Sequence, residues 1–165
     1  MSAGDGDRQR AHIAVRDATP ADADAIVDLT RRAFAQQAVL YEDDSLPPLQ
    51  DTPETVLGAI ERGVVLVAED DDGTIVGSVR GEMRDGSCLV SRLVVEPSLQ
   101  GRGLGRTLAS ALEERFETAG RFEIFTGHRS EPALHLYESL GYVRERTEYV
   151  HERLSLVFLG KPRRT

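Results

Sequence analysis

The sequence of 165 residues contains one cysteine, Cys88, one lysine, Lys161, and no tryptophan. A single cysteine excludes an internal disulfide and a zinc site built from cysteines. The longest wholly apolar run covers residues 64–68, whereas a membrane-spanning helix needs roughly 20 apolar residues. The chain does not begin with the basic and then apolar stretch of a signal peptide. We therefore expect a cytoplasmic protein with no membrane partner.

Positive charge is also scarce. The chain carries 28 Asp and Glu residues against 20 Lys and Arg residues, which gives a formal net charge of −8. Binding to a phosphate backbone needs a surplus of Lys and Arg, so we expect no nucleic-acid partner. The negative charge has two interpretations: it keeps the chain soluble, or it favours a small cationic substrate.

Turn and capping residues divide the chain into short elements. Residues 1–10 are polar and non-periodic, which predicts a flexible tail ahead of one domain over residues 11–165. Thr19 and Pro20 predict a helix start, with Asp22 placed for a capping box. From the periodicity of apolar residues we expect seven strands, at residues 12–17, 64–68, 75–83, 88–95, 121–126, 142–150 and 154–159. We expect four helices: one that begins at residue 20, one that begins at 51–53 and ends at 63, one from 104 to 120, and one that begins at 130 or 131 and ends at 141.

The resulting order of elements is β-α-α-β-β-β-α-β-α-β-β. It indicates an α/β (α+β) fold with a mixed, largely antiparallel central sheet and helices on both faces. Two Asp-Gly pairs, at 72–73 and 85–86, predict tight hairpin turns within the antiparallel part.

A glycine-rich segment, QGRGLGR at residues 100–106, lies between an apolar strand and an amphipathic helix. Glycines let the backbone approach a ligand closely, and free amides at the following helix start favour an anion. The segment is no P-loop, because Gly-Lys-Ser/Thr is absent, and Arg106 breaks the dinucleotide pattern G-x-G-x-x-G. It indicates a phosphate cradle, and a flexible loop before a helix is the alternative.

Two motifs resemble those of the GNAT N-acetyltransferase superfamily. The spacing Q-x-x-G-x-G at residues 100–105 follows a strand that ends Leu-Val-Val-Glu-Pro, as in the acyl-CoA pyrophosphate loop of that family. The segment LHLYESLGY at residues 134–142 is similar to the family's helix that carries a tyrosine and ends at L-G-F/Y. The predicted order of elements also agrees with a GNAT-like fold over about residues 11–160.

The resemblance implies acetyl-CoA as acyl donor and no metal. Strand 88–95 would splay from strand 121–126 and leave a gap for the pantetheine arm, to which main-chain groups of Leu93 and Val95 would bind. A backbone amide near Val94 or Val95 would polarise the thioester carbonyl. The implied cofactor-binding residues are Leu93, Val94, Val95, Gln100, Gly101, Arg102, Gly103, Leu104, Gly105, Arg106 and Ser130.

Ser130 departs from the family pattern. The family often has asparagine at this place near the start of the tyrosine helix, where it contacts the pantetheine arm. Serine makes similar hydrogen bonds with a shorter reach, or it caps the helix.

The resemblance also implies that side chains contribute little to the chemistry. Tyr137 matches the family's usual general acid, which protonates the departing thiolate; its place on an apolar helix stripe also fits a core tyrosine. Glu82 is a candidate base, directly or through a water, or an exposed strand residue paired with Arg80 or Arg84. A water chain without any base is a third interpretation.

The acceptor side is expected near residues 41–50 and the last hairpin. Glu42 and Asp43 are candidates for binding an ammonium group, or they belong to a solvated loop. His151 falls near the turn between the last two strands, where a surface histidine is the simpler interpretation. Cys88 fits a core residue, and the histidines show no metal-binding spacing.

These observations lead to a hypothesis of an acetyl-CoA-dependent N-acetyltransferase that acts on a primary amine by direct transfer in a ternary complex. The acceptor class covers small molecules and peptides. A non-catalytic acyl-CoA-binding regulatory module is the alternative, and a nucleotide-binding protein of another kind is a third. Members of the family often dimerise through sheet edges or the last strands, so the resemblance leaves two interpretations of the apolar residues 154–159: a homodimer contact, or burial in the core.

Overall fold

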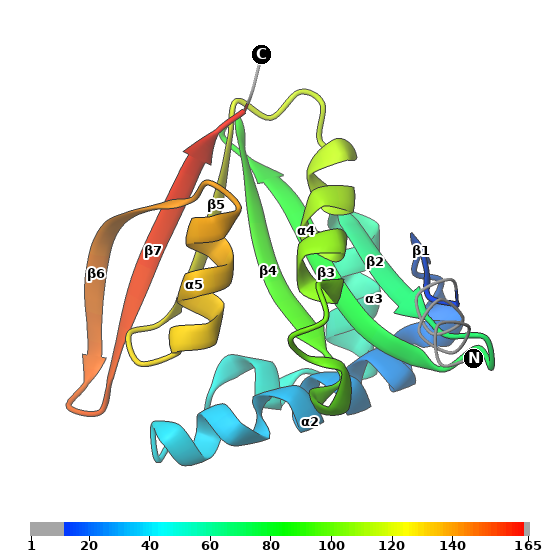
Figure 1. The fold of residues 1–165 in the computed structure, drawn as a ribbon, viewed down its shortest axis with the longest axis horizontal. Coiled ribbons are helices and arrows are strands. Elements are labelled where there is room, and N and C mark those ends of the chain that lie inside the picture. Colours follow the sequence, from blue (N-terminus) through cyan, green and yellow to red (C-terminus); the bar gives the residue numbers. More distant parts are fainter. Residues whose placement is uncertain (1–11, 164–165) are drawn as a thin grey trace, which may run out of the picture.

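The computed structural model describes residues 12–163, so the tail expected at residues 1–10 lies outside the described residues. Strands and helices follow the order expected from the sequence (Figure 1). The strands are β1 Ala14–Asp17, β2 Val64–Glu69, β3 Ile75–Arg84, β4 Ser87–Val95, β5 Arg121–Gly127, β6 Val143–His151 and β7 Leu154–Pro162. The helices are α2 Ala23–Leu40, α3 Pro53–Arg62, α4 Leu104–Glu114 and α5 Glu131–Ser139, with 3-10 turns at Pro20–Asp22, Pro47–Gln50 and Pro97–Leu99.

All seven strands form one sheet in the order β1-β2-β3-β4-β5-β7-β6. Neighbouring strands are antiparallel except for β4 and β5, which run parallel. These two strands pair over only three residue pairs, from Ser87↔Arg121 to Leu89↔Glu123. Beyond them β4 and β5 diverge (Figure 1), which confirms the expected splay and divides the sheet into two halves.

Helices cover both faces of the sheet, as expected. α4 and α5 pack on one face through a core that includes Leu66, Leu108 and Tyr137. α2 and α3 pack on the opposite face through a second core that includes Val65 and Val56. Because Leu66 and Val65 are neighbours in β2, this strand is buried on both sides, which explains its continuous apolar run.

The hairpin between β3 and β4 turns where the sequence predicts it. Asp85 and Gly86 both have positive φ angles, 52° and 84°. A two-residue turn with both residues in this region follows the right-handed twist of the flanking strands, and Asp-Gly adopts it readily.

The helix expected to run from residue 104 to Gly120 ends earlier, at Glu114. The backbone N–H of Phe116 bonds to the carbonyl of Glu113 (3.2 Å), three residues back rather than four. Such bonds tighten the last turn and end the helix. Phe116 still packs in the core from this turn, so the apolar stripe extends beyond the helix that begins it.

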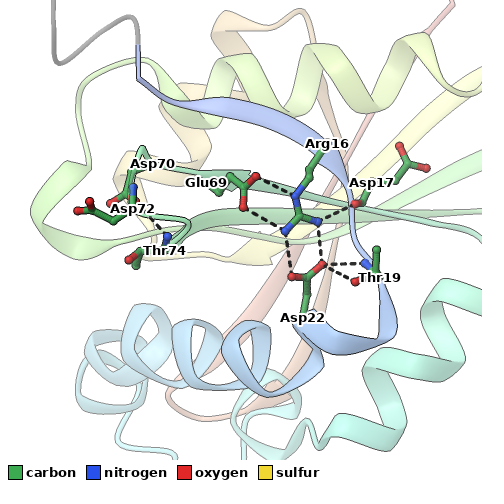
Figure 2. A network of polar contacts seen from close by, with 8 residues as sticks. All are labelled: Arg16, Asp17, Thr19, Asp22, Glu69, Asp70, Asp72 and Thr74. Atoms are coloured by element: carbon green, nitrogen blue, oxygen red, sulfur yellow. Dashed lines mark hydrogen bonds and ion pairs between the residues drawn. The ribbon is translucent and has the colours of Figure 1, made fainter.

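The start of the first long helix is also different, because Pro20–Asp22 forms a 3-10 turn before α2. Arg16 of β1 bonds to both oxygens of Asp22 (2.8 and 3.0 Å) and both oxygens of Glu69 (3.1 and 3.1 Å), as Figure 2 shows. We call Arg16, Asp22 and Glu69 the Arg16 cluster. The hydrogen bond from Arg16, with one from the backbone of Thr19 (2.7 Å), lowers the pKa of Asp22 to about 2. The cluster ties β1, the 3-10 turn and β2 together.

Among residues 12–163 we find no helix with both the length and the apolar character needed to cross a membrane.

Candidate active site

The gap between β4 and β5 exposes main-chain groups of β4. The N–H of Glu96 donates to the carbonyl of Val76 in β3 (2.8 Å). Main-chain groups alternate along a strand in an antiparallel pair. The alternation therefore directs the main-chain groups of Val95 toward the gap and those of Val94 toward β3. Leu93 lies within a register irregularity of β4, where the alternation is interrupted. Of the two amides considered for the thioester carbonyl, that of Val95 faces the gap.

A bulge interrupts β4 just before these residues. The register with β3 shifts between Ser91 and Val94, so that Arg92 and Leu93 lie opposite one residue of β3. Arg92 has a φ of 52°, in the left-handed region. The bulge changes which face the later side chains occupy: Val90 packs in the core with α4, whereas Val94 packs in the core with α2 and α3. The sequence alone gave no sign of it.

The glycine-rich segment opens α4 at the wide end of the gap. Gly101 and Gly103 have φ angles of 81° and 86°, which side chains rarely adopt, and a Cβ at either place would meet open space. Gly105 differs, since a Cβ there would lie 3.1 Å from the side chain of Leu136 in α5. Two glycines therefore shape a backbone that faces solvent, and the third allows α4 to approach α5. Free amides at the start of α4 suit a phosphate.

The other residues of the glycine-rich segment differ in their partners and in their exposure to solvent. Gln100 donates from its side chain to the carbonyl of Val95 (3.3 Å), the last residue of β4. Arg106 donates to the hydroxyl of Ser139 at the end of α5 (2.7 Å), and Leu104 is buried. Arg102 is exposed in the loop. Arg106 is exposed as well, but its guanidinium is bonded to α5, so Arg102 is the better placed of the two arginines to meet an anion beside the open glycines.

Tyr137 lies on α5, on the same face of the sheet as α4. Its side chain is 7% exposed, and its ring centroid is 6.2 Å from that of Tyr142. Burial raises the pKa of Tyr137 to about 12, so the phenol keeps its proton at neutral pH. The burial fits both interpretations, a core tyrosine and a proton donor.

Ser130 is buried at the start of α5 and bonds to α2. The backbone N–H of Arg129 donates to the hydroxyl of Tyr41 (2.9 Å), which bonds to the hydroxyl of Ser130 (2.7 Å). Ser130 in turn donates to the side-chain oxygen of Gln37 (2.7 Å). Ser130 is the N-cap residue of α5, as the capping interpretation expects, but its side chain makes no capping bond to the backbone of the helix. The chain of hydrogen bonds fixes the start of α5, and with it Tyr137, against the end of α2.

A pocket of about 460 Å³ lies beside the point where β4 and β5 separate, on the sheet face that α3 covers. Glu82 lines this pocket and forms an ion pair with Arg62 of α3 (Nε to Oε1, 3.6 Å). The partners expected from the sequence were Arg80 or Arg84. Glu82 and Tyr137 therefore lie on opposite faces of the sheet, on either side of the gap.

Three charged residues that the sequence analysis did not assign to the site stand at the edge of this pocket. Asp51, whose side chain is 7% exposed, accepts from Arg92 (Nε to Oδ2, 2.9 Å) and from Arg80 (Nη2 to Oδ2, 3.4 Å). We call these three residues the Asp51 cluster. In the sequence, arginines inside the otherwise apolar strands β3 and β4 are the sign that a charged site lies here. Asp51 gives no such sign, because its place in the sequence indicates only a helix start.

The acceptor-side candidates meet in space. His151 lies 2.8 Å from Asp43 through Nε2, and its Nδ1 accepts from the backbone N–H of Arg153 (3.1 Å). Hydrogen bonds from Ser45 and His151 lower the pKa of Asp43 to about 2. Both ring nitrogens of His151 thus have hydrogen-bond partners within the chain. This favours a structural role, in which His151 joins the loop at residues 41–50 to the β6–β7 hairpin, over the binding of an acceptor. An ion pair between Glu42 and Arg153 (3.6 Å) reinforces this connection.

Comparison with known proteins shows the family. The family model of the acetyltransferase (GNAT) domain matches residues 61–144, just over half of the chain. The chain belongs to the GNAT acetyltransferase family. The matched segment holds β2 to β5, the glycine-rich segment and the helix with Tyr137, so both motifs noted in the sequence lie within the GNAT domain.

Individual relatives are more distant. The spore coat polysaccharide biosynthesis protein SpsD of Bacillus subtilis (strain 168) is 26% identical over 139 residues, which are 80% of this chain and 47% of SpsD. The chain thus spans about half of that protein. The L-amino acid N-acyltransferase MnaT of Escherichia coli (strain K12) is 28% identical over 141 residues, 79% of this chain and 80% of MnaT.

Solved structures confirm the fold. The structure of yncA from Salmonella typhimurium, a protein described as an acetyltransferase with its cofactor acetyl-CoA, has a TM-score of 0.73 to this chain. The two are 23% identical, and the match covers 92% of this chain and 94% of the other. The GNAT-like arrangement expected from the order of elements is therefore confirmed.

Proposed function

We propose that this protein transfers an acetyl group from acetyl-CoA to the nitrogen of a primary amine, by direct attack in a ternary complex. The observation that supports this most strongly is the opening between β4 and β5. It has an open glycine cradle at its wide end and a pocket beside its narrow end. One end suits a pyrophosphate and the other suits an acceptor, and between them lies an edge of β4 that pairs with β5 only over residues 87–89.

The described residues fit the acyl donor. Amides of Gly101 to Gly105 and the start of α4 would hold the pyrophosphate, because no Cβ fills the space beside Gly101 or Gly103. Arg102 would add positive charge. Main-chain groups of Leu93 and Val95 would hold the pantetheine arm as a strand is held. Acetyl-CoA supplies the activated acetyl thioester, so this chain need only bind, orient and move protons.

Two proton movements remain for side chains. The amine must lose a proton to attack, and Glu82 stands on the pocket side of the sheet to accept it, directly or through a water. The sulfur of CoA must gain a proton as it leaves. Tyr137, a buried phenol on the opposite face whose raised pKa keeps it protonated, is the candidate donor.

Calorimetric titration with acetyl-CoA tests the cradle. We expect the wild type to bind and Gly103→Asp to bind at least about tenfold more weakly, because the substitution adds a side chain and a negative charge beside the phosphates. Gly73→Asp is the matched control: Gly73 has a φ of 79° and open space at its Cβ, but lies in the β2–β3 turn. Absence of binding by folded wild type would overturn the proposed donor.

Release of the CoA thiol across a panel of amines then separates an enzyme from a regulatory module. We expect Tyr137→Phe to lower kcat roughly 100-fold with an unchanged Kd for acetyl-CoA. Tyr142→Phe, which alters the neighbouring buried tyrosine, controls for packing. Binding of acetyl-CoA without turnover of any amine would favour the acyl-CoA-binding module instead.

A further inference from the structure

The pocket beside the β4–β5 separation has a charge opposite to that of the chain. The formal net charge of the protein is −8, yet the residues lining this pocket include five arginines and two glutamates. The five arginines come from three different parts of the fold, α3, the central strands and β6, and converge on one volume. They are Arg62, Arg80, Arg84, Arg92 and Arg146.

The inner wall of the pocket holds positive charge that the chain does not fully neutralise. Asp51 is shared between the guanidiniums of Arg92 and Arg80. Both arginine side chains are mostly buried, so neither charge is well hydrated. Burial, with repulsion from Arg92, lowers the pKa of Arg80 despite the attraction of Asp51. A positive charge that is buried and only partly neutralised is stabilised when an anion binds beside it.

The outer wall adds arginines with free donors. Arg84 has no carboxylate partner within the described part of the chain, residues 12–163. Arg146 lies over the ring of Phe158, with its guanidinium carbon 4.0 Å from the ring centroid. Its Nε pairs with Glu148 (3.2 Å), so the donors that Arg146 could offer to a ligand in the pocket are the terminal N–H groups of its guanidinium.

An apolar surface lies beside these charges. Phe125 of β5 is 46% exposed, and its ring centroid is 5.2 Å from that of Phe158. Both rings and Leu89 line the pocket. An aromatic pair with one exposed ring, next to convergent arginines, is typical of a site that binds an anion attached to an apolar group.

We propose that this pocket binds the carboxylate of the acceptor, so that the substrate is a primary amine that also carries a carboxylate and an apolar side chain, as an amino acid does. This inference rests on the proposed function, since it names the substrate class of the same site. It replaces the small cationic acceptor that the net charge of the chain favours, because local charge at the site differs in sign from the average.

Binding of the reaction product tests this without any turnover. We would titrate the protein, with CoA present and absent, with N-acetyl-L-phenylalanine and N-acetyl-L-leucine and with the carboxamide of each. The amides match the acids in shape but lack the negative charge. We expect each acid to bind at least about tenfold more tightly than its amide, since charge-assisted hydrogen bonds to arginine are lost in the amide.

Arg146→Gln and Arg84→Gln should reduce this preference several-fold. Arg144→Gln is the matched control, because Arg144 lies two residues away in β6, has a similar exposure (50% against 55%), and likewise pairs with a glutamate. It lies outside the residues that line the pocket. Loss of the preference in Arg144→Gln as well would overturn the assignment to the pocket.

Turnover provides the second readout, with L-phenylalanine compared with L-phenylalaninamide in kcat/KM. Equal affinity for acids and amides, or no binding by either pair, overturns the carboxylate subsite whatever the enzyme does with other amines. Preferential binding of the acids with no release of CoA thiol from any amine supports the subsite and overturns the proposed acetyl transfer. The two proposals therefore fail by different results.

Discussion

The Arg16 cluster and the Asp51 cluster both pair arginines of the sheet with carboxylates, but the ratio of positive to negative groups is reversed. In the Arg16 cluster one guanidinium is shared by two carboxylates, through four hydrogen bonds of 2.8–3.1 Å (Figure 2). In the Asp51 cluster one carboxylate is shared by two guanidiniums, at 2.9 and 3.4 Å. The first joins three segments of the chain, and the second opens onto a pocket with further arginines.

The difference shows how a structural ion pair is distinguished from one at a binding site. In the Arg16 cluster the surplus charge is negative, both carboxylates bond to Arg16, and none of the three residues lines a pocket in the described part of the chain. In the Asp51 cluster two mostly buried guanidiniums share one carboxylate beside a pocket, so the chain neutralises only part of their positive charge. The remaining charge is available to a ligand, so the sign of the surplus predicts the sign of the ligand.

The largest expected effect on stability is from Asp51→Asn. The substitution leaves Arg80 and Arg92 mostly buried without a counter-charge, and breaking a buried pair in this way costs roughly 3 kcal/mol. Unfolding in urea, followed by circular dichroism, measures the change in the free energy of unfolding. The double variant Asp51→Asn/Arg92→Gln should recover part of the loss, because one of the two unpaired charges is removed. A single-variant loss below about 1 kcal/mol would contradict the comparison.

A smaller loss is expected from Asp22→Asn in the Arg16 cluster. Arg16 keeps Glu69 as a partner, and its side chain is 35% exposed, so solvent screening limits the loss to about 1 kcal/mol. The loss should depend on pH. The pKa of Asp22 lies near 2 in the folded chain, below its usual 3.8, so the stabilisation is present above about pH 4 and disappears as the pH falls through about 2.

Urea unfolding of the wild type and Asp22→Asn at several pH values between about 5 and 2 measures this dependence. The two free energies of unfolding should converge as the pH falls. A constant difference would show that the ionised carboxylate contributes nothing. Acetyl-CoA affinity and kcat/KM should be the same in both proteins, because the Arg16 cluster has no residue in the candidate site.

Much of the fold could be predicted because local signals agreed with one another. Asp-Gly turns, the Thr52-Pro53 helix start and alternating apolar residues indicated every strand and helix in order. The end of α4 was missed, because the apolar stripe continues to Phe116 in a turn that is no longer α-helical. The bulge at Arg92 was missed as well, since a positive φ at an arginine has no signature in composition or periodicity.

Parts of the candidate site could be proposed from the sequence where a local motif marks them, but not where the partners come from distant segments. The glycine-rich segment and Tyr137 were identified by local pattern. The partners of Ser130 and Asp51 lie 89–93 and 29–41 residues away, respectively, and pairing over such distances cannot be deduced from a single sequence. Net charge does not reveal the charge of a local site for a related reason: it averages over the whole chain, whereas the pocket gathers arginines from separate elements.

The smallest expected effect comes from salt. Arg146 is 55% exposed at the rim of the pocket, so ions screen its attraction for a carboxylate, whereas Asp22 is 13% exposed and is screened much less. Raising NaCl from roughly 0.05 to roughly 0.5 M should weaken binding of N-acetyl-L-phenylalanine about threefold. Binding of its amide should change little, and so should the difference in unfolding free energy between wild type and Asp22→Asn. An equal response of the acid and the amide to salt would show that the ligand does not contact the surplus positive charge. The Asp51 cluster would then differ from the Arg16 cluster only in how deeply its residues are buried.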